Sequence, residues 1–158
     1  MNYIIGKILD DLEDSVNKND IKYFYFGKPY AIDNNILNAG ALIVNPIRTD
    51  ISSVATGLKD HASYEIEIIL AKNVKPSFYK NAQKDAGHSF LTRVMEGTDA
   101  SGSLLTNTIR YVIRNKMRDY GIKQEGMSID YDDQRFENEG CVTATMSITQ
   151  IGEQLQPV

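Results

Sequence analysis

The chain has 158 residues, of which 42% are hydrophobic and 24% are charged, proportions close to those of ordinary globular domains. This length fits one domain, and the composition disfavours disordered, collagen-like and coiled-coil proteins. The formal net charge of −4 argues against a protein whose main task is to grip nucleic-acid phosphates, because that task needs clustered Lys and Arg in excess.

Cysteine content and apolar runs narrow the class of protein further. Cys141 is the only cysteine, so the chain cannot form an intramolecular disulfide, a zinc knuckle or a CxxC redox pair. Residues 1–7 lack the apolar core and cleavage site of a signal peptide, and acidic residues follow at Asp10 and Asp11. No apolar run approaches the ~20 residues that a membrane-spanning helix needs. We therefore expect a protein that is made in the cytoplasm and has no membrane contact.

The first predicted elements are a helix and two strands. The helix is amphipathic, and its apolar residues, spaced three to four apart, are Ile5, Ile8, Leu9, Leu12 and Val16. The aromatic run 22–26 predicts a strand that ends at Gly27. A polar loop, 33–38, then leads to the apolar run 41–44, which predicts a strand covered on both faces. Pro46 is expected to end this strand or to place it at an edge.

A long loop and a third strand are predicted next. Residues 49–61 are rich in Ser, Thr, Gly and Asp without a regular period, which predicts a loop. Loops of ~12 residues or more in a compact domain are often functional. In the strand that follows, apolar residues alternate with Glu65 and Glu67, so we expect one buried and one solvent-exposed face. The apolar residues of this strand are Tyr64, Ile66, Ile68 and Leu70.

The central part of the chain predicts two helices joined by a connector at 97–102. The first would follow Ser77, and its core-facing residues would be Phe78, Ala82, Phe90 and Val94. Gly87 interrupts the pattern of this helix. The second helix is expected to end at Gly121. Its apolar side is formed by Leu105, Ile109, Val112, Ile113, Lys116 and Tyr120.

The last predicted elements form a β-hairpin. Residues 127–131 and 142–148 alternate between apolar and polar side chains, and residues 136–140 turn the chain between them. A flexible C-terminal tail, 151–158, is expected after a domain of residues 1–150. The order of the elements predicts a single α/β (α+β) domain with an antiparallel or mixed sheet of about five strands packed by two to three helices.

No recognisable catalytic, cofactor-binding or metal-binding motif appears in the sequence. It lacks the Walker and GxGxxG phosphate loops and the GxSxG nucleophile turn. His61 and His88, the only histidines, are interpreted as surface or structural residues rather than proton carriers. Cys141 is expected to point outward or to lie at the sheet margin, and the sequence shows no base that would activate it. We therefore predict that the protein is not an enzyme and uses no cofactor or metal.

An acidic segment at the predicted hairpin begins like a calcium-binding loop, with Asp130 and Asp132 at alternate positions. The match fails because Arg135 stands at the glycine position and Cys141 stands at the closing glutamate position. We interpret the segment, which also contains Asp133, as a solvent-exposed and strongly charged face of the hairpin.

Three arginines form a ridge on the second central helix, because Arg110, Arg114 and Arg118 follow one another at four-residue steps. The simplest interpretation is a solvated helix side. The alternative is a binding surface, since arginine favours bidentate pairing with carboxylates or phosphates. The ridge could pair with the acidic hairpin of a neighbouring subunit or contact DNA, and the acidic net charge favours the protein partner. The candidate subunit-interface residues are therefore Arg110, Arg114, Arg118, Asp130, Asp132 and Asp133.

An N-terminal amphipathic helix, strands at 41–44 and 63–71, the helix sequence 104–114 and a terminal strand at 140–148 follow one another along the chain. In order, size and hydrophobic pattern, these elements resemble the tail-terminator and tail-completion (neck) proteins of long-tailed bacteriophages. The segment 75–98 fits that pattern least well. The resemblance implies an α/β fold and a structural virion protein that forms a hexameric ring on the tail tube, ends tube growth and docks the tail to the head connector.

The resemblance also implies partners and a location. The partners are other copies in the ring, tail-tube and head-connector proteins, and DNA that passes through the pore without specific binding. The location is the tail or neck of the virion. The pattern carries no catalytic residues. Two alternatives remain open: another phage assembly subunit, either a head-tail joining or a tail-tube protein, and a small enzyme with a dispersed carboxylate site at Glu65, Glu67 or Asp130.

Overall fold

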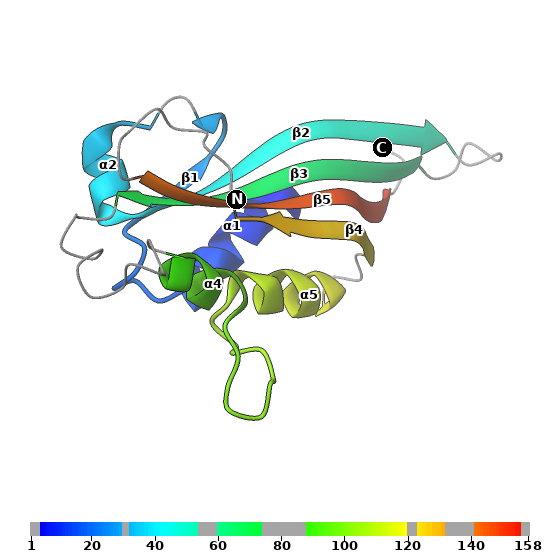
Figure 1. Ribbon diagram of the computed structural model, residues 1–158. Coiled ribbons are helices and arrows are strands. Elements are labelled where there is room, and N and C mark those ends of the chain that lie inside the picture. The colour runs from blue at the N-terminus through cyan, green and yellow to red at the C-terminus, as the bar shows by residue number, and fades with distance from the viewer. Residues whose placement is uncertain are drawn as a thin grey trace.

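A computed structural model describes residues 4–29, 32–53, 60–73, 88–119, 123–131 and 141–155. In these ranges one five-stranded sheet is packed by four helices in a single α+β domain (Figure 1). The helices are α1 (Ile4–Ser15), α2 (Asn34–Ala39), α4 (His88–Glu96) and α5 (Ile109–Asp119). The strands are β1 (Tyr23–Phe26), β2 (Ala41–Ser53), β3 (Asp60–Asn73), β4 (Lys123–Asp130) and β5 (Cys141–Leu155). The predicted fold class is confirmed, with more helices than the expected two to three.

The strands lie in the order β1-β2-β3-β5-β4, so β3 occupies the centre and β1 and β4 form the edges. β1 pairs with β2 in parallel and all other neighbours pair antiparallel, which makes the sheet mixed. The predicted hairpin is confirmed, because Met127 pairs with Ile148 and Ile129 pairs with Met146. Its turn, 136–140, lies outside the described residues.

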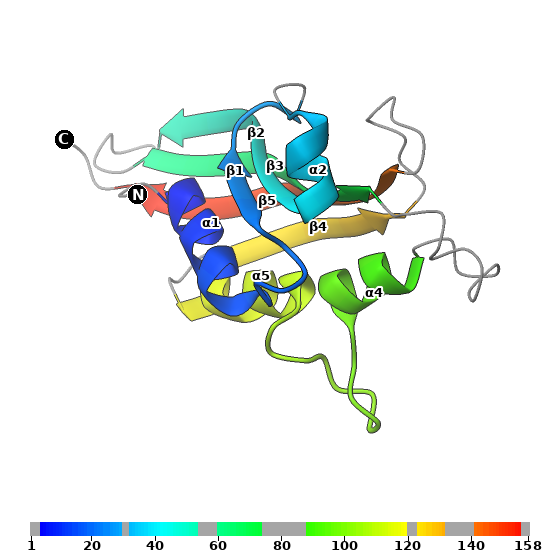
Figure 2. The ribbon, with the colours of Figure 1, turned by 90° about the vertical axis from the view of Figure 1, so that its left-hand side faces the viewer.

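One face of the sheet carries the main core and is covered by α1, α4 and α5. Figure 2 shows α5 lying between α1 and α4 below the sheet. Every second residue of the three central strands points into this core, as the pleat requires. The fully buried strand residues include Leu42, Val44, Ile68, Leu70, Ala144, Met146 and Ile148, and the helices contribute Leu12, Met95 and Ile109. The amphipathic first helix is thus confirmed, as is the burial of Phe90 and Val94 in α4. The expected helix residues Phe78 and Ala82 lie outside the described part.

The opposite face of the sheet is covered at one end by α2, which packs against β3 (Figure 1). Leu37 of α2 is fully buried, as are Ile43 and Ile69. Residues 41–44 are therefore covered on both faces, as predicted. The expected polar loop at 33–38 is wrong, because Asp33 caps a short helix there: its carboxylate accepts a hydrogen bond from the amide of Ile36 at 3.0 Å.

β2 does not end at Pro46, but the alternative expectation is confirmed: Pro46 lies at an edge, because among the described residues β1 pairs only with residues 41–44 of β2. The register of β2 to β3 shifts between Pro46 and Arg48, and the register of β3 to β5 shifts at the same level, between Tyr64 and Ile66. A bulge of this kind lets a strand bend and continue in spite of the missing proline N–H. Three strands thus continue as a distal arm, which we define as residues 48–53, 60–65 and 151–155. Figure 1 shows that β2 and β3 extend beyond the end of α5.

The distal arm corrects two expectations. Residues 49–53 and 60–61 are strand rather than loop, and only residues 54–59 between them lie outside the described part. The expected C-terminal tail at 151–158 is wrong for residues 151–155, because they pair with β3, from Tyr64 to Asp60. Sequence patterns missed the arm residues 49–53, 60–61 and 151–155. No helix of the described part covers them, so they do not need the apolar alternation of a buried strand.

α5 begins at Ile109, not at Leu105 as its apolar pattern suggested, and it ends at Asp119. Leu105 lies before the helix with 39% of its surface exposed. The start is fixed by the fully buried Thr108, whose hydroxyl oxygen accepts from the amide of Tyr111 at 3.3 Å and donates to the carbonyl of Leu105 at 2.8 Å. This is the hydrogen-bond pattern of an N-cap, and it satisfies a free helical N–H.

Replacing Thr108 with alanine is expected to lower the free energy of unfolding by about 1 to 2 kcal/mol, because the cap bond is lost and the Leu105 carbonyl loses a donor. Denaturant titration measures this change. The matched control is Thr106→Ala at an exposed position, where we expect a change within about 0.5 kcal/mol. Equal effects of the two substitutions would rule out capping by Thr108.

Candidate interaction surfaces

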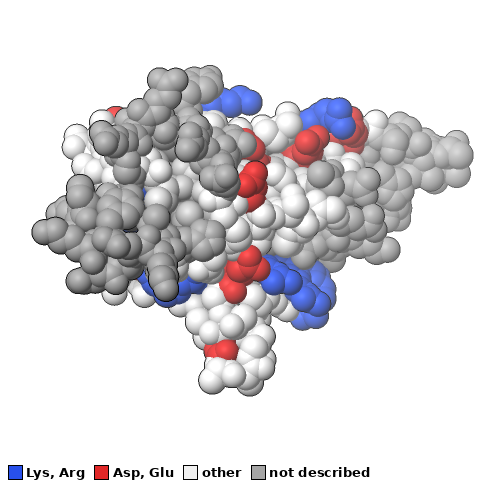
Figure 3. All heavy atoms as spheres, in the orientation of Figure 1, with Lys and Arg blue, Asp and Glu red and all other residues white. Residues whose placement is uncertain are grey.

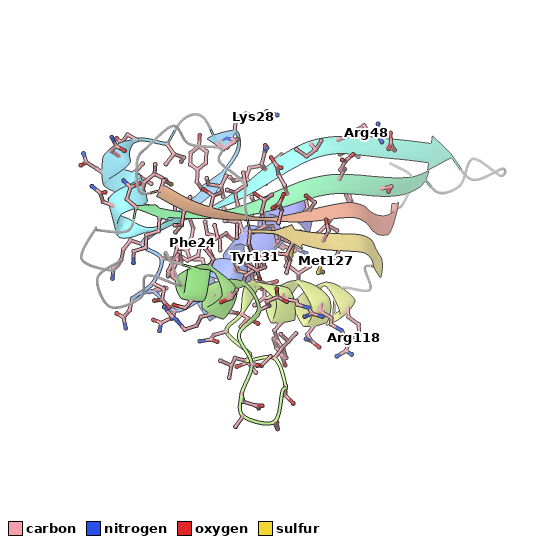
Figure 4. All side chains as sticks on the ribbon, viewed as in Figure 1. Phe24, Lys28, Arg48, Arg118, Met127 and Tyr131 are labelled. Carbon is pink, nitrogen blue, oxygen red and sulfur yellow. The ribbon has the colours of Figure 1, made fainter. Side chains whose placement is uncertain are left out.

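The three arginines of the predicted ridge lie on α5, on the side away from the buried residues Ile109 and Val112. The side chain of Arg110 is 41% exposed and forms an ion pair within the chain. Arg114 and Arg118 are exposed and make no ion pair with any described residue. Figure 3 shows basic side chains gathered over α5, and Figure 4 shows Arg118 projecting from the outer side of the helix.

The partner of Arg110 is Glu96, the last residue of α4. Nη1 of Arg110 lies 3.1 Å from Oε1 of Glu96, and the hydroxyl of Tyr131 donates a hydrogen bond to Oε2 of the same carboxylate. Tyr131 directly follows the last residue of β4 (Figure 4). One carboxylate thus joins α4, α5 and the end of β4, and we call this group the Glu96 junction. The sequence did not reveal it because its members lie 14 and 35 residues from Glu96.

Burial is the main cause that raises the pKa of Tyr131 above the usual value of a tyrosine. The hydrogen bond to Glu96 and the negative charge of that carboxylate act in the same direction, while the nearby Arg110 partly opposes them. The junction therefore keeps the phenol protonated at neutral pH, as a hydrogen-bond donor rather than a general base.

This raised pKa predicts a loss of stability at alkaline pH. The unfolded chain releases the Tyr131 proton near pH 10, whereas the folded chain holds it at higher pH. The contribution of Tyr131 is therefore fully present below about pH 10 and is lost as pH rises through the folded pKa. We expect stability measured between about pH 9 and 11 to fall less steeply in Tyr131→Phe than in the unchanged protein. Identical slopes would contradict the assignment.

The acidic half of the predicted interface is only partly described. Asp130 is exposed at the end of β4, while Asp132 and Asp133 lie outside the described residues. Arg110 is held by Glu96 of its own chain, so the arginines that can meet a partner without breaking a described ion pair are Arg114 and Arg118. Pairing between the ridge and the acidic hairpin of a second subunit stays a prediction.

The three carboxylates of the enzyme alternative lie on two strands that are not neighbours, with Glu65 and Glu67 on β3 and Asp130 on β4. Glu67 was expected on a solvated face, which is wrong: it is buried, and the side-chain amide of Asn45 donates to it at 2.7 Å. Glu65 lies 3.8 Å from Arg48, on the distal arm. Asp130 lies on β4, which β5 separates from β3, so about 10 Å of sheet separates it from Glu67. Asp130 is therefore too far from Glu67 to exchange a proton directly with the same reacting group.

A second ion pair ties α4 to the turn after α1. Both terminal nitrogens of Arg93 reach the carboxylate of Asp20, at 2.6 and 3.1 Å, and this hydrogen bonding raises the pKa of Arg93. A pocket of about 100 Å³ lies beside the pair, with Val16, Val94 and Leu105 among its lining residues. Sites for drug-sized ligands are typically several times larger, so this pocket does not suit a cofactor.

The cysteine and the two histidines considered in the sequence analysis show no features of a reactive site in the described part of the chain. Cys141 is half-buried at the first residue of β5, where burial raises the pKa of its thiol. A raised pKa disfavours the reactive thiolate, so Cys141 is better explained as a structural residue at the sheet margin than as an activated nucleophile. His61 lies in β3 and His88 begins α4, but their side chains are outside the described part. Among the described residues, no three His, Cys, Asp or Glu side chains are grouped to hold a metal ion.

No family model matches this sequence, and no curated protein matches it either. Within the described ranges, no helix combines the length and apolarity that crossing a bilayer requires. The surfaces of the fold therefore carry the information about function.

Proposed function

We propose that this protein is a structural virion subunit from the neck of a tailed-phage particle. In this proposal, copies form a ring, hexameric in the resembled proteins, at the head-proximal end of the tail. The ring ends growth of the tail tube and docks the tail to the head connector. DNA passes through the pore without specific binding, in keeping with the acidic net charge of −4.

The observation that carries this proposal is the distal arm. Sheets are normally covered on at least one face, yet this part of the sheet extends past the helix layer (Figure 1). Ile47 and Ile51 on β2 are 47% and 64% exposed, and Arg48 between them is 66% exposed. Apolar side chains left open beside charged ones on a projecting sheet are typical of a surface that a protein partner covers.

The proposal is tested by measuring the mass of the purified protein alone and after mixing with tail tubes. A ring that binds to one end of the tube and stops its elongation is the expected result. A strict monomer that never associates with tubes would contradict the proposal. Electron microscopy of particles that lack the protein should show tails of abnormal length or tails that fail to join heads, and normal particles would argue against it equally strongly.

The second candidate is another assembly subunit of the same kind of particle, either a head-tail joining or a tail-tube protein. The distal arm is compatible with these roles as well, because it offers a partner surface without specifying the partner. Tube subunits polymerise into long stacks, whereas a terminator stops at one ring. Electron microscopy of the purified assembly separates the two, since open-ended stacks would favour the tube protein.

A further inference from the structure

The outer surface of α5 combines the side chains that dominate protein interfaces. Tyr111, Arg114 and Arg118 are spaced three and four residues apart, so they lie along one stripe of the helix. Tyr111 is half-buried and the two arginines are exposed. Tyrosine and arginine are enriched at the centre of protein interfaces, where lysine is depleted. We call these three residues the α5 stripe.

The α5 stripe is anchored from one side. Glu96 holds Arg110, one turn before Arg114, and the side-chain amide of Asn115 donates to the carbonyl of Tyr111 at 3.0 Å. These bonds fix the helix surface but leave Arg114 and Arg118 without an ion pair among the described residues. Two neighbouring free guanidinium groups repel each other, and a pair of carboxylates would relieve that repulsion.

The same chain carries such carboxylates on α1. Glu13 and Asp14 are exposed there and form no ion pair with a described residue. They are neighbours on the solvent-exposed side of α1, so their two carboxylates lie within reach of two guanidinium groups from another chain.

We propose that the α5 stripe of one copy binds the acidic outer side of α1 on the next copy. This inference rests on the proposed ring and names one contact that closes it. The two surfaces are different patches of the chain, on the neighbouring helices α5 and α1 (Figure 2). When each copy gives its α5 stripe to one neighbour and its α1 surface to the other, the contact is heterologous and can be repeated around a ring, whereas two copies that exchange both contacts form a closed pair. DNA is the weaker occupant because the chain is acidic overall, with a net charge of −4.

Charge reversal tests the contact. Arg114→Glu with Arg118→Glu makes both surfaces acidic, while Glu13→Lys with Asp14→Lys makes both surfaces basic. We expect each double variant to weaken assembly at least ~10-fold for each reversed pair, because like charges then face one another. An equimolar mixture of the two variants should assemble again, since every contact in an alternating ring would join opposite charges. A ring with an even number of copies can alternate in this way.

The control is Lys22→Glu with Lys28→Glu, which changes the net charge as much as the arginine variant does but at exposed lysines outside the stripe. It should assemble like the unchanged protein. Thermal unfolding and the milder pair Arg114→Gln with Arg118→Gln separate loss of contact from loss of folding. Normal assembly of a folded charge-reversed variant would overturn the contact. So would failure of the mixture to assemble, or a loss of duplex-DNA binding in the arginine variant with assembly intact.

The same measurements keep the two proposals apart. If the unchanged protein and the lysine control form rings, and the charge-reversed variants form them equally well, the proposed function stands and the contact is wrong. If the mixture restores only a pair of copies, the contact stands and the ring is wrong. A monomeric unchanged protein contradicts both.

Discussion

Replacing Ile68 with alanine is expected to lower the free energy of unfolding by about 3 to 5 kcal/mol. Ile68 has no exposed surface and lies at the middle of the central strand β3, where it pairs with Val44 on one side and Met146 on the other. Truncation removes apolar contacts with both neighbouring strands and leaves a cavity under the helix layer. A domain is stable by only about 5 to 15 kcal/mol, so the variant should unfold at much lower denaturant concentration.

The control for Ile68 is Ile51→Ala in the distal arm. Ile51 is 64% exposed, so little buried surface is lost and we expect a change within about 0.5 kcal/mol in the isolated chain. If Ile51→Ala instead destabilises the assembled protein much more than the isolated chain, the arm is covered in the assembly. Equal costs for the two substitutions in the isolated chain would show that the assigned core is misplaced.

Replacing Gly40 with alanine is expected to cost about 2 to 4 kcal/mol of folding free energy. Gly40 ends α2 with a φ of +93°, a conformation that side-chain-bearing residues rarely adopt. A Cβ atom there would lie 2.5 Å from the backbone oxygen of Asp20, which cannot move without shifting the turn after α1. Gly40 also accepts from the amides of Lys22 and Tyr23 at 3.1 Å, so a shift would disturb the start of β1.

Gly102→Ala separates conformational strain from steric clash. Gly102 has a φ of +87°, but no atom lies within 4 Å of the position that its Cβ would take. We expect a cost of about 1 kcal/mol, from the backbone conformation alone. Chemical denaturation of both variants measures the difference, and a Gly40 variant as stable as the Gly102 variant would show that the close approach to Asp20 is absent.

The Glu96 junction changes what the arginine ridge means. The helical spacing of Arg110, Arg114 and Arg118 was visible in the sequence, because residues four apart share a helix side whatever surrounds them. Which of them is engaged within the chain was not visible, since it depends on the packing of α4 beside α5. The basic side of the candidate interface therefore contains two arginines, Arg114 and Arg118, rather than the three that the sequence suggested. Its acidic partner in our inference comes from α1 rather than from the hairpin.

Local pattern determined much of the fold. The first helix, the strand containing Ile66 and Ile68, and the hairpin of β4 and β5 were predictable because each buries one regular side against the core, and that periodicity is written in neighbouring residues. The absence of known catalytic motifs was equally a property of the sequence. From these features the fold class followed, because a chain with this order of elements has few ways to bury all its apolar sides.

Only the tertiary structure decided the features that depend on residues far apart in the chain. Glu67 is buried, and the side-chain amide of Asn45 on the neighbouring strand donates a hydrogen bond to its carboxylate, although the alternation of Glu67 with apolar residues suggested a solvated face. The distal arm forms because paired strands satisfy their backbone hydrogen bonds even where no helix of the described part covers them. Most of its residues therefore do not follow an apolar period. The apolar period of a helix or strand indicates which of its sides is buried within the same chain. Surfaces that the chain does not cover itself, such as the distal arm and the α5 stripe, can be identified only after the positions of the helices on the sheet are known.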